Sequence, residues 1–316
     1  MQPAEFDPAR FGRGEKHRLA LEVDGGVALP VLLARGAAEG KTLVTSANVH
    51  GDEYEGVRAI FEIFDELDTA GMAGDWLAVP VVNPPAFWNG TRCSPVDEEN
   101  LARVFPGDAD GTISKKIAHY FGRCIIARGD FYLDLHSGGV NFRMPSMAGY
   151  WAEDPRGRAA AEIFGAPVIW GHPVIDPGRT VSFAKDCNVP FLYTEARGAG
   201  RIHPEDLEMM KSGIRNLLMH LSILQGMIAK NPPRMRLYGN GNTDTGLAST
   251  QRGFLINSVQ ILDRVRKGQV LGTLVNLTGE VLERYLSPAD GIVGMTKEFP
   301  IVKPGESLFL IADEEA

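Results

Sequence analysis

The chain has 316 residues, 44% of them hydrophobic and 23% charged, with a formal net charge of −8 at pH 7. This length can bury a large core, and we expect one large domain with a smaller one. The acidic balance and the absence of a basic stripe argue against nucleic acid as a partner. The N-terminal residues lack a basic start followed by an apolar stretch, and no uncharged apolar run approaches the roughly 20 residues of a membrane helix. We therefore expect neither a signal peptide nor a membrane partner.

Three cysteines, Cys93, Cys124 and Cys187, are scattered along the chain and form neither a metal-ligand pair nor an even disulfide framework. Reduced thiols are typical of the cytoplasm, where we expect the protein to act. A homo-oligomer is compatible with the sequence.

In chain order, the first two thirds alternate short apolar runs with segments that repeat apolar residues every three or four positions. The runs predict strands over 41–49, 76–82, 131–136, 167–170 and 191–195. The periodic segments predict helices over 52–67, 113–128 and 203–224. Strands interleaved with helices predict an α/β domain with a largely parallel or mixed sheet flanked by helices.

The Asn-Pro-Pro sequence at 231–233 predicts a linker, which divides the chain into domains 1–230 and 231–316. The second part looks all-β, and its segment 265–271 is echoed by 302–308 with the same spacing of Val, Gly and Leu. This repeat resembles the small barrel-like sandwich of lipoyl and biotinyl carrier domains. A carrier needs a lysine between the two halves, and none occurs from Gly268 to Thr296. We therefore expect a barrel-like domain that packs on or covers the active site and carries no cofactor.

His50 and Glu53, three residues apart, are matched by His136 far downstream. Two imidazoles and one carboxylate can hold a catalytic zinc, one per chain, with the fourth position open for water or substrate. His50, His136 and Glu195 follow or end predicted strands, and Glu53 opens the next predicted helix. Ligands gather beyond the carboxyl ends of strands in such domains, so the placements agree.

Glu195 ends an apolar strand, where a carboxylate is costly, and is our candidate for the base that a zinc hydrolase requires. Each histidine ligand also needs an acceptor on its second nitrogen. Asp134 alternates onto the strand face of His136, and Asp97 or Asn100 could serve His50. Asp134 with His136 could instead be a buried structural pair, and Glu195 a structural ion-pair partner. We interpret His172 and His203, beside prolines, as structural or solvent-facing.

The segment 89–107 is rich in turn formers and carries two arginines, Arg92 and Arg103. The planar guanidinium can bind both oxygens of a carboxylate, which favours a substrate-binding loop. The alternative is that these arginines only keep the surface soluble.

Together these residues resemble the succinylglutamate desuccinylase/aspartoacylase family, the deacylase branch of the zinc carboxypeptidase fold. The resemblance covers nearly the whole chain. It rests on His-Gly-Asp-Glu at 50–53, Asn-Pro at 83–84, the arginine loop, Asp-Leu-His-Ser at 134–137 and Thr-Glu at 194–195.

The resemblance implies hydrolysis of a small N-acyl amino acid by zinc-activated water. His50, Glu53 and His136 would hold the zinc, and Glu195 would act as base and then acid. Arg92 would polarise the acyl carbonyl, and Arg103 and Asn100 would bind the substrate. The family often has Asn-Leu-Asn-Arg where this chain has Asn-Leu-Ala-Arg at 100–103, so Ala102 leaves the usual substrate in doubt.

Two other functions stay open at this point. A zinc carboxypeptidase would use the same site on peptides, although the short chain and appended β-domain favour a small, enclosed substrate. A catalytically silent binding protein could keep the fold, although the intact ligand set and Glu195 argue against it.

Overall fold

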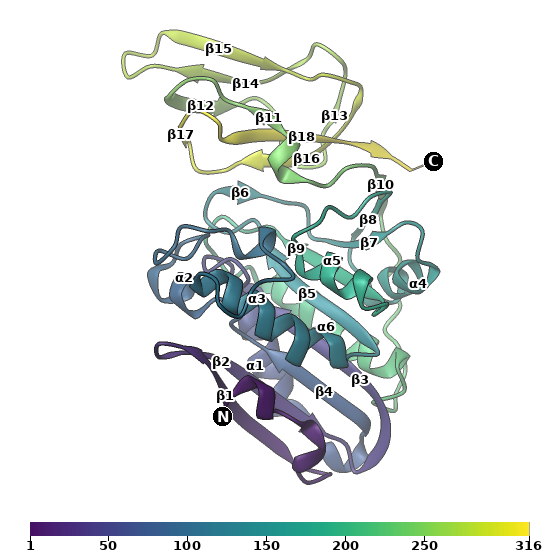
Figure 1. The fold of residues 1–316 in the computed structure, drawn as a ribbon. Coiled ribbons are helices and arrows are strands. Elements are labelled where there is room, and N and C mark those ends of the chain that lie inside the picture. Colours follow the sequence, from purple (N-terminus) through teal and green to yellow (C-terminus); the bar gives the residue numbers. More distant parts are fainter. Residues whose placement is uncertain (316) are drawn as a thin grey trace.

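The computed structural model describes residues 1–315, which form a mixed α/β unit with a β-rich unit at one end (Figure 1). The large sheet has 14 strands. In spatial order its main path is β1 (Lys16–Asp24), β2 (Val27–Arg35), β4 (Ala73–Val79), β3 (Ala38–Ala47), β5 (Phe131–Ser137), β9 (Phe191–Ala196), β7 (Met147–Trp151), β8 (Val168–His172), β10 (Met235–Tyr238), β18 (Ser307–Glu314), β16 (Gly291–Lys297) and β13 (Arg264–Val265). The predicted fold class is confirmed.

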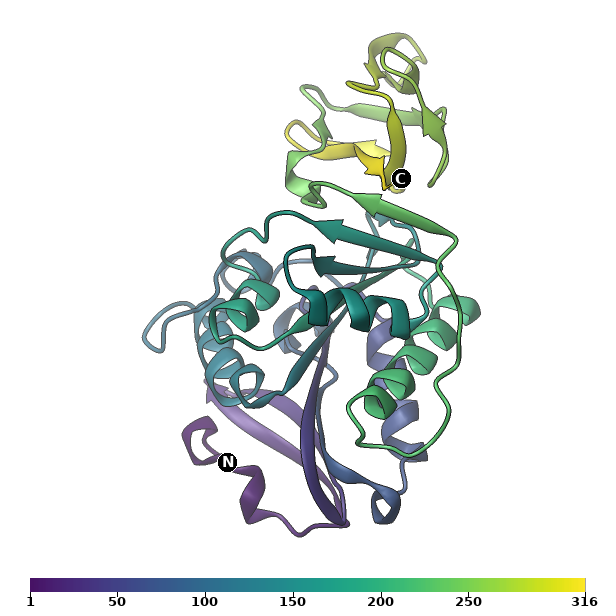
Figure 2. The ribbon, with the colours of Figure 1, turned by 90° about the vertical axis from the view of Figure 1, so that its right-hand side faces the viewer.

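Helices cover both faces of the large sheet (Figure 2). One face packs against α1 (Glu55–Glu66), α4 (Pro155–Phe164) and α6 (Pro204–His220), and the other against α3 (Ile113–Cys124) and α5 (Thr180–Asp186). The central strands β4, β3, β5 and β9 are parallel and, apart from the exposed first residues of β3, largely buried on both sides. This explains why their sequences read as continuous apolar runs and do not alternate.

The structure moves several predicted boundaries, and one of them matters for the site. Helix α1 begins at Glu55, so Glu53 does not open the helix as predicted. Glu53 lies in a turn, where its N–H donates to the His50 carbonyl (3.3 Å). The side-chain amide of Asn48 donates to the carbonyl of Glu53 (2.8 Å). The turn leaves the Glu53 carboxylate free to face both histidines.

The structure also contains elements that the sequence analysis did not predict. The N-terminal hairpin of β1 and β2, the strand β7, and helices α4, α5 and α2 (Pro84–Asn89) were not predicted. Strand β1 alternates exposed with less exposed side chains because only one of its faces packs against the core, so its apolar signal is weak.

The C-terminal residues continue the large sheet. Strand β10 follows the predicted linker and pairs in parallel with β8 and antiparallel with β18. The short strands β6 (Phe142–Arg143) and β11 (Leu247–Ala248) pair with β16 and β18. A second sheet of β15 (Val281–Leu286), β14 (Val270–Val275), β12 (Gly253–Asn257) and β17 (Ile301–Val302) completes the β-rich unit around its own core. Among residues 1–315, no helix has the length and apolar character needed to cross a bilayer.

Candidate active site

The structure brings His50, Glu53 and His136 together beyond the carboxyl ends of β3 and β5. One ligand atom from each lies within 4.8 Å of the others. His50 and Glu53 are only 4% and 3% exposed. Glu195 joins them because β5 and β9 are parallel neighbours, with His136 directly opposite Glu195 in the register. The predicted metal ligands and the predicted base therefore line one pocket.

The Glu53 carboxylate contacts the imidazoles of both His50 and His136. Its Oε1 is 2.7 Å from Nδ1 of His50 and its Oε2 is 2.9 Å from Nδ1 of His136. The two Nε2 atoms point away, toward Asn100 Oδ1 (3.2 Å) and Asp134 Oδ2 (3.0 Å). Because both partners are acceptors, they favour a proton on Nε2 of each ring. Nδ1, which faces the Glu53 carboxylate, is then the nitrogen that would bind a metal in place of a proton.

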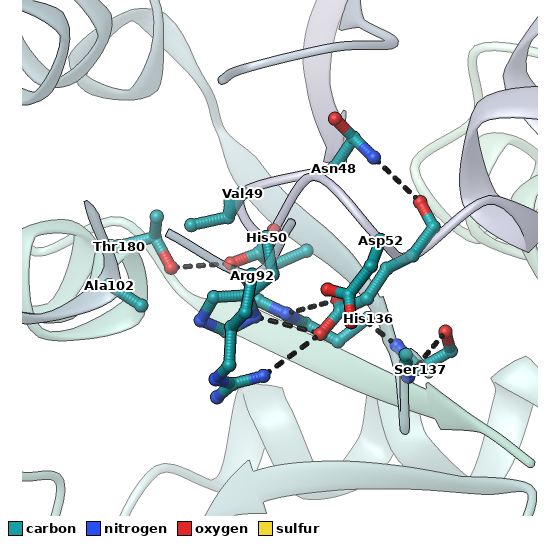
Figure 3. A network of polar contacts seen from close by, with 12 residues as sticks. Asn48, Val49, His50, Asp52, Arg92, Ala102, His136, Ser137 and Thr180 are labelled. Carbon is teal, nitrogen blue, oxygen red and sulfur yellow. Dashed lines mark hydrogen bonds and ion pairs between the residues drawn. The ribbon is translucent and has the colours of Figure 1, made fainter. Parts of the chain in front are cut away.

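Asp134 anchors His136 through a buried network. The Ser46 hydroxyl donates to Asp134 Oδ1 (2.7 Å), and Ser46 lies 2.6 Å from the Tyr132 hydroxyl. The hydroxyl of Thr180, the first residue of α5, donates to Asp134 Oδ2 (Figure 3). Asp134 is fully buried, and such donors stabilise a carboxylate that has lost contact with water.

The buried acidic and basic groups of this cluster shift one another's pKa values. Burial favours the neutral form of Glu53, but the two histidines outweigh it and lower the pKa of Glu53. Burial and the negative charge of Glu53 raise the pKa of Glu195 to about 8. Oε2 of Glu195 is buried without a hydrogen-bond partner among residues 1–315. Two nitrogen donors, a carboxylate and a second, unpaired carboxylate fit a divalent ion such as Zn²⁺.

Comparison with known proteins identifies the family of this chain. The catalytic-domain model of succinylglutamate desuccinylase/aspartoacylase matches residues 39–221. The N-alpha-acetyl-L-2,4-diaminobutyric acid deacetylase of Halomonas elongata is 32% identical over 299 residues, which is 92% of this chain and 86% of that protein. The chain belongs to the succinylglutamate desuccinylase/aspartoacylase family.

Solved structures of this family are similar over nearly the whole chain. A succinylglutamate desuccinylase from Silicibacter sp. TM1040 superposes with a TM-score of 0.86 at 28% identity, covering 95% of each chain. The product-bound ectoine utilization protein EutE (DoeB) from Ruegeria pomeroyi superposes with a TM-score of 0.85 at 27% identity, again over 95% of each chain. The β-rich unit is therefore shared, although it lies outside the residues that the catalytic-domain model matches.

The loop predicted to bind substrate reaches the pocket of this family member. Nη1 of Arg92 is 3.4 Å from Glu53 Oε1, and Arg92 also lies over the ring of Phe142. Arg103 lines the pocket, but its Nε donates to Asp244 Oδ2 (2.7 Å) in the β-rich unit. Ala102 lines the pocket too and presents only a methyl group to it.

The two residues suggested as partners of His50 are placed differently. Asn100 is the one in contact, and its Oδ1 also accepts from the Ala102 N–H (2.9 Å), which fixes the orientation of the amide. Asp97 lies instead at the start of α3, where it accepts from Ser114 N (2.8 Å) and Oγ (3.0 Å). A carboxylate there caps the helix and does not reach the histidine.

Several pocket residues were not found from the sequence. His172 is 3% exposed and bonded to Tyr193, so it is neither in a loop nor solvent-facing. Tyr193 shares a face of β9 with Glu195, and that alternation was a signal that could have found it. Asp176 and Arg179 follow β8, and residues 240–243 come from beyond the predicted linker. Nothing in their local sequence indicates that they meet the site.

Proposed function

We propose that the protein hydrolyses the amide bond of a small N-acyl amino acid, using one zinc ion per chain held by His50, Glu53 and His136. One observation carries the proposal: a carboxylate between two Nδ1 atoms, with a second, unpaired carboxylate directly across the β5–β9 register. Family membership favours deacylation over the carboxypeptidase alternative.

When bound, zinc supplies a Lewis acid that polarises the acyl carbonyl and makes water a better nucleophile near neutral pH. Glu195 takes the proton from the attacking water and passes it to the leaving nitrogen, which departs as an amine. Its raised pKa suits both roles, since the group must accept and then release a proton near neutral pH. Arg92 donates hydrogen bonds to the carbonyl oxygen as negative charge develops there.

The remaining residues bind the substrate. Arg103 contacts the substrate carboxylate through the guanidinium nitrogens that Asp244 and the Ala102 carbonyl leave available. Asn100 lies in the same loop as Arg103 and also orients the ring of His50. The substrate of the Halomonas elongata relative makes N-acetyl diamino acids the first compounds to test. The three free cysteines favour action in a reducing compartment, the cytoplasm.

The first experiment measures zinc content and amine release from a panel of N-acyl amino acids, with the wild type, Glu195→Gln and His50→Ala. Glu195→Gln should keep zinc and lose roughly 100-fold to 10,000-fold in turnover, because only the proton carrier is removed. His50→Ala should lose the zinc itself.

Dipeptides with a free C-terminal carboxylate, the substrates that a carboxypeptidase would cleave, serve as the comparison compounds in that panel. Full turnover of zinc-free protein, or hydrolysis of the dipeptides alone, would contradict the proposal.

A further inference from the structure

Two pocket residues outside the proposed catalytic set form a hydrogen-bonded pair. His172 is the last residue of β8, and Tyr193 lies on β9 two residues before Glu195. Nε2 of His172 is 2.7 Å from the Tyr193 hydroxyl, and both side chains line the pocket. The proposed reaction gives neither residue a role.

Two glycines leave room for this pair. A Cβ atom on Gly149 would lie 2.2 Å from Cε1 of Tyr193, and one on Gly241 would lie 2.3 Å from Cε1 of His172. Real Cβ atoms do not approach other atoms so closely, so any larger residue at either position would displace a ring. The pair is therefore held in place by β7 on one side and by the segment after β10 on the other.

The direction of each hydrogen bond follows from the partners. Nδ1 of His172 is 2.9 Å from the carbonyl oxygen of Gly239, which can only accept, so Nδ1 carries the proton. Burial lowers the pKa of His172 to about 4, so the ring is neutral near pH 7 and Nε2 is an acceptor. The Tyr193 hydroxyl must then donate its proton to Nε2. The Nδ1–H of His172 and the O–H of Tyr193 are thus both engaged in hydrogen bonds. The Tyr193 oxygen can therefore act toward a ligand only as an acceptor.

We propose that Tyr193, positioned by His172, determines specificity by accepting a hydrogen bond from a free amino group on the amino-acid portion of the substrate. An ammonium group provides such a donor, and the carboxyl group of Glu195, whose Oε2 has no hydrogen-bond partner among residues 1–315, lies on the same face of β9. Arg179, a cation that lines the same pocket, is paired with Asp176 (Nη2–Oδ2 3.0 Å). A carboxylate in this position would meet lone pairs instead of donors and be disfavoured. Tyr193 should therefore favour N-acyl diamino acids over N-acyl amino acids that lack a second amino group. This inference rests on the proposed function.

The test compares N-α-acetyl-2,4-diaminobutyrate with N-acetyl-2-aminobutyrate, which lacks the second amino group. The wild type should prefer the diamino compound in kcat/KM. Tyr193→Phe should reduce that preference, the ratio of the two kcat/KM values, roughly 10-fold to 100-fold, the loss expected for a hydrogen bond to a charged group. Tyr120→Phe, on α3 outside the pocket, is the matched control and should change neither value.

A second variant removes the positioning residue. His172→Leu should also reduce the preference, because it frees the Tyr193 hydroxyl to rotate and donate. Equal use of both compounds by the wild type, or an unchanged preference in Tyr193→Phe, would overturn the inference and leave the proposed function intact. A wild type that hydrolyses no N-acyl amino acid would contradict the proposed function itself.

Discussion

Among the individual residues, Asp134 shows how much of the site depends on side chains that no ligand touches. It accepts hydrogen bonds from His136, Ser46 and Thr180 and is completely buried. Burial alone would lower the pKa of His136, but the negative charges of Asp134 and Glu53 favour the protonated ring and raise this pKa. An anion in this position makes the imidazole a stronger ligand and fixes the ring that presents Nδ1.

Thr180→Val removes one of these hydroxyl donors while keeping the shape of the side chain. We expect it to weaken zinc binding by about 10-fold to 100-fold, since loss of such a supporting partner loosens the ligand ring. Thr180→Ser keeps the hydroxyl and should bind zinc as the wild type does. Competition with a zinc-binding dye measures both constants without any need for turnover, and equal affinity in the two variants would show that the hydroxyl is not needed.

The candidate residues His50, His136 and Glu195 could be brought together from the sequence because each lies at or shortly after the end of an apolar strand. Parallel strands place such positions at one sheet edge, whatever the loops between them do. His172 and Asp97 could not be placed in this way. Whether a histidine beside a proline is buried depends on Tyr193 and Gly239, which approach it from other strands.

The secondary-structure elements were predictable to the extent that their own sequences fix them. Helix α3 and strands β5 and β9 begin where predicted because the apolar pattern and the Thr112 N-cap are local. Strand β10 has only four residues and is stabilised by pairing with β8 and β18, so its existence depends on distant parts of the chain. The same distance explains why the segment after β10 was not expected in the pocket.

That segment includes a short 3-10 helix, Thr243–Thr245, and its Asp244 holds the Nε of Arg103. We expect Asp244→Ala to raise KM several-fold for carboxylate-bearing substrates with kcat unchanged, because the guanidinium must then be ordered by the substrate alone. Asp244→Asn retains an oxygen acceptor for Nε and should stay close to the wild type. Steady-state kinetics of the two variants decide the point, and an unchanged KM in Asp244→Ala would mean that Arg103 needs no anchor.

For the molecule as a whole, the two units are joined by a continuous sheet and by one buried cation. Lys297 at the end of β16 is 2% exposed and contacts both units. Its Nζ lies 3.1 Å from Glu306 in the β-rich unit and 3.3 Å from Asn141 Oδ1 in the α/β unit. It also lies over the ring of Phe142, the pocket residue that Arg92 contacts from its own loop. The β-rich unit thus supports the wall of the active site.

Lys297→Met tests this connection, since methionine fills similar space but provides no charge or donor. Asn141 and Glu306 lose their shared partner, and the ring of Phe142 loses one of its two cations, so the midpoint of thermal unfolding should fall by several degrees. Lys303→Met, at an exposed position of the same unit, should leave the midpoint unchanged. Because β6 carries Phe142 into the pocket, Lys297→Met should also lower kcat/KM while its zinc content stays complete. A variant with the wild-type midpoint and wild-type kinetics would show that strand pairing alone holds the two units in register.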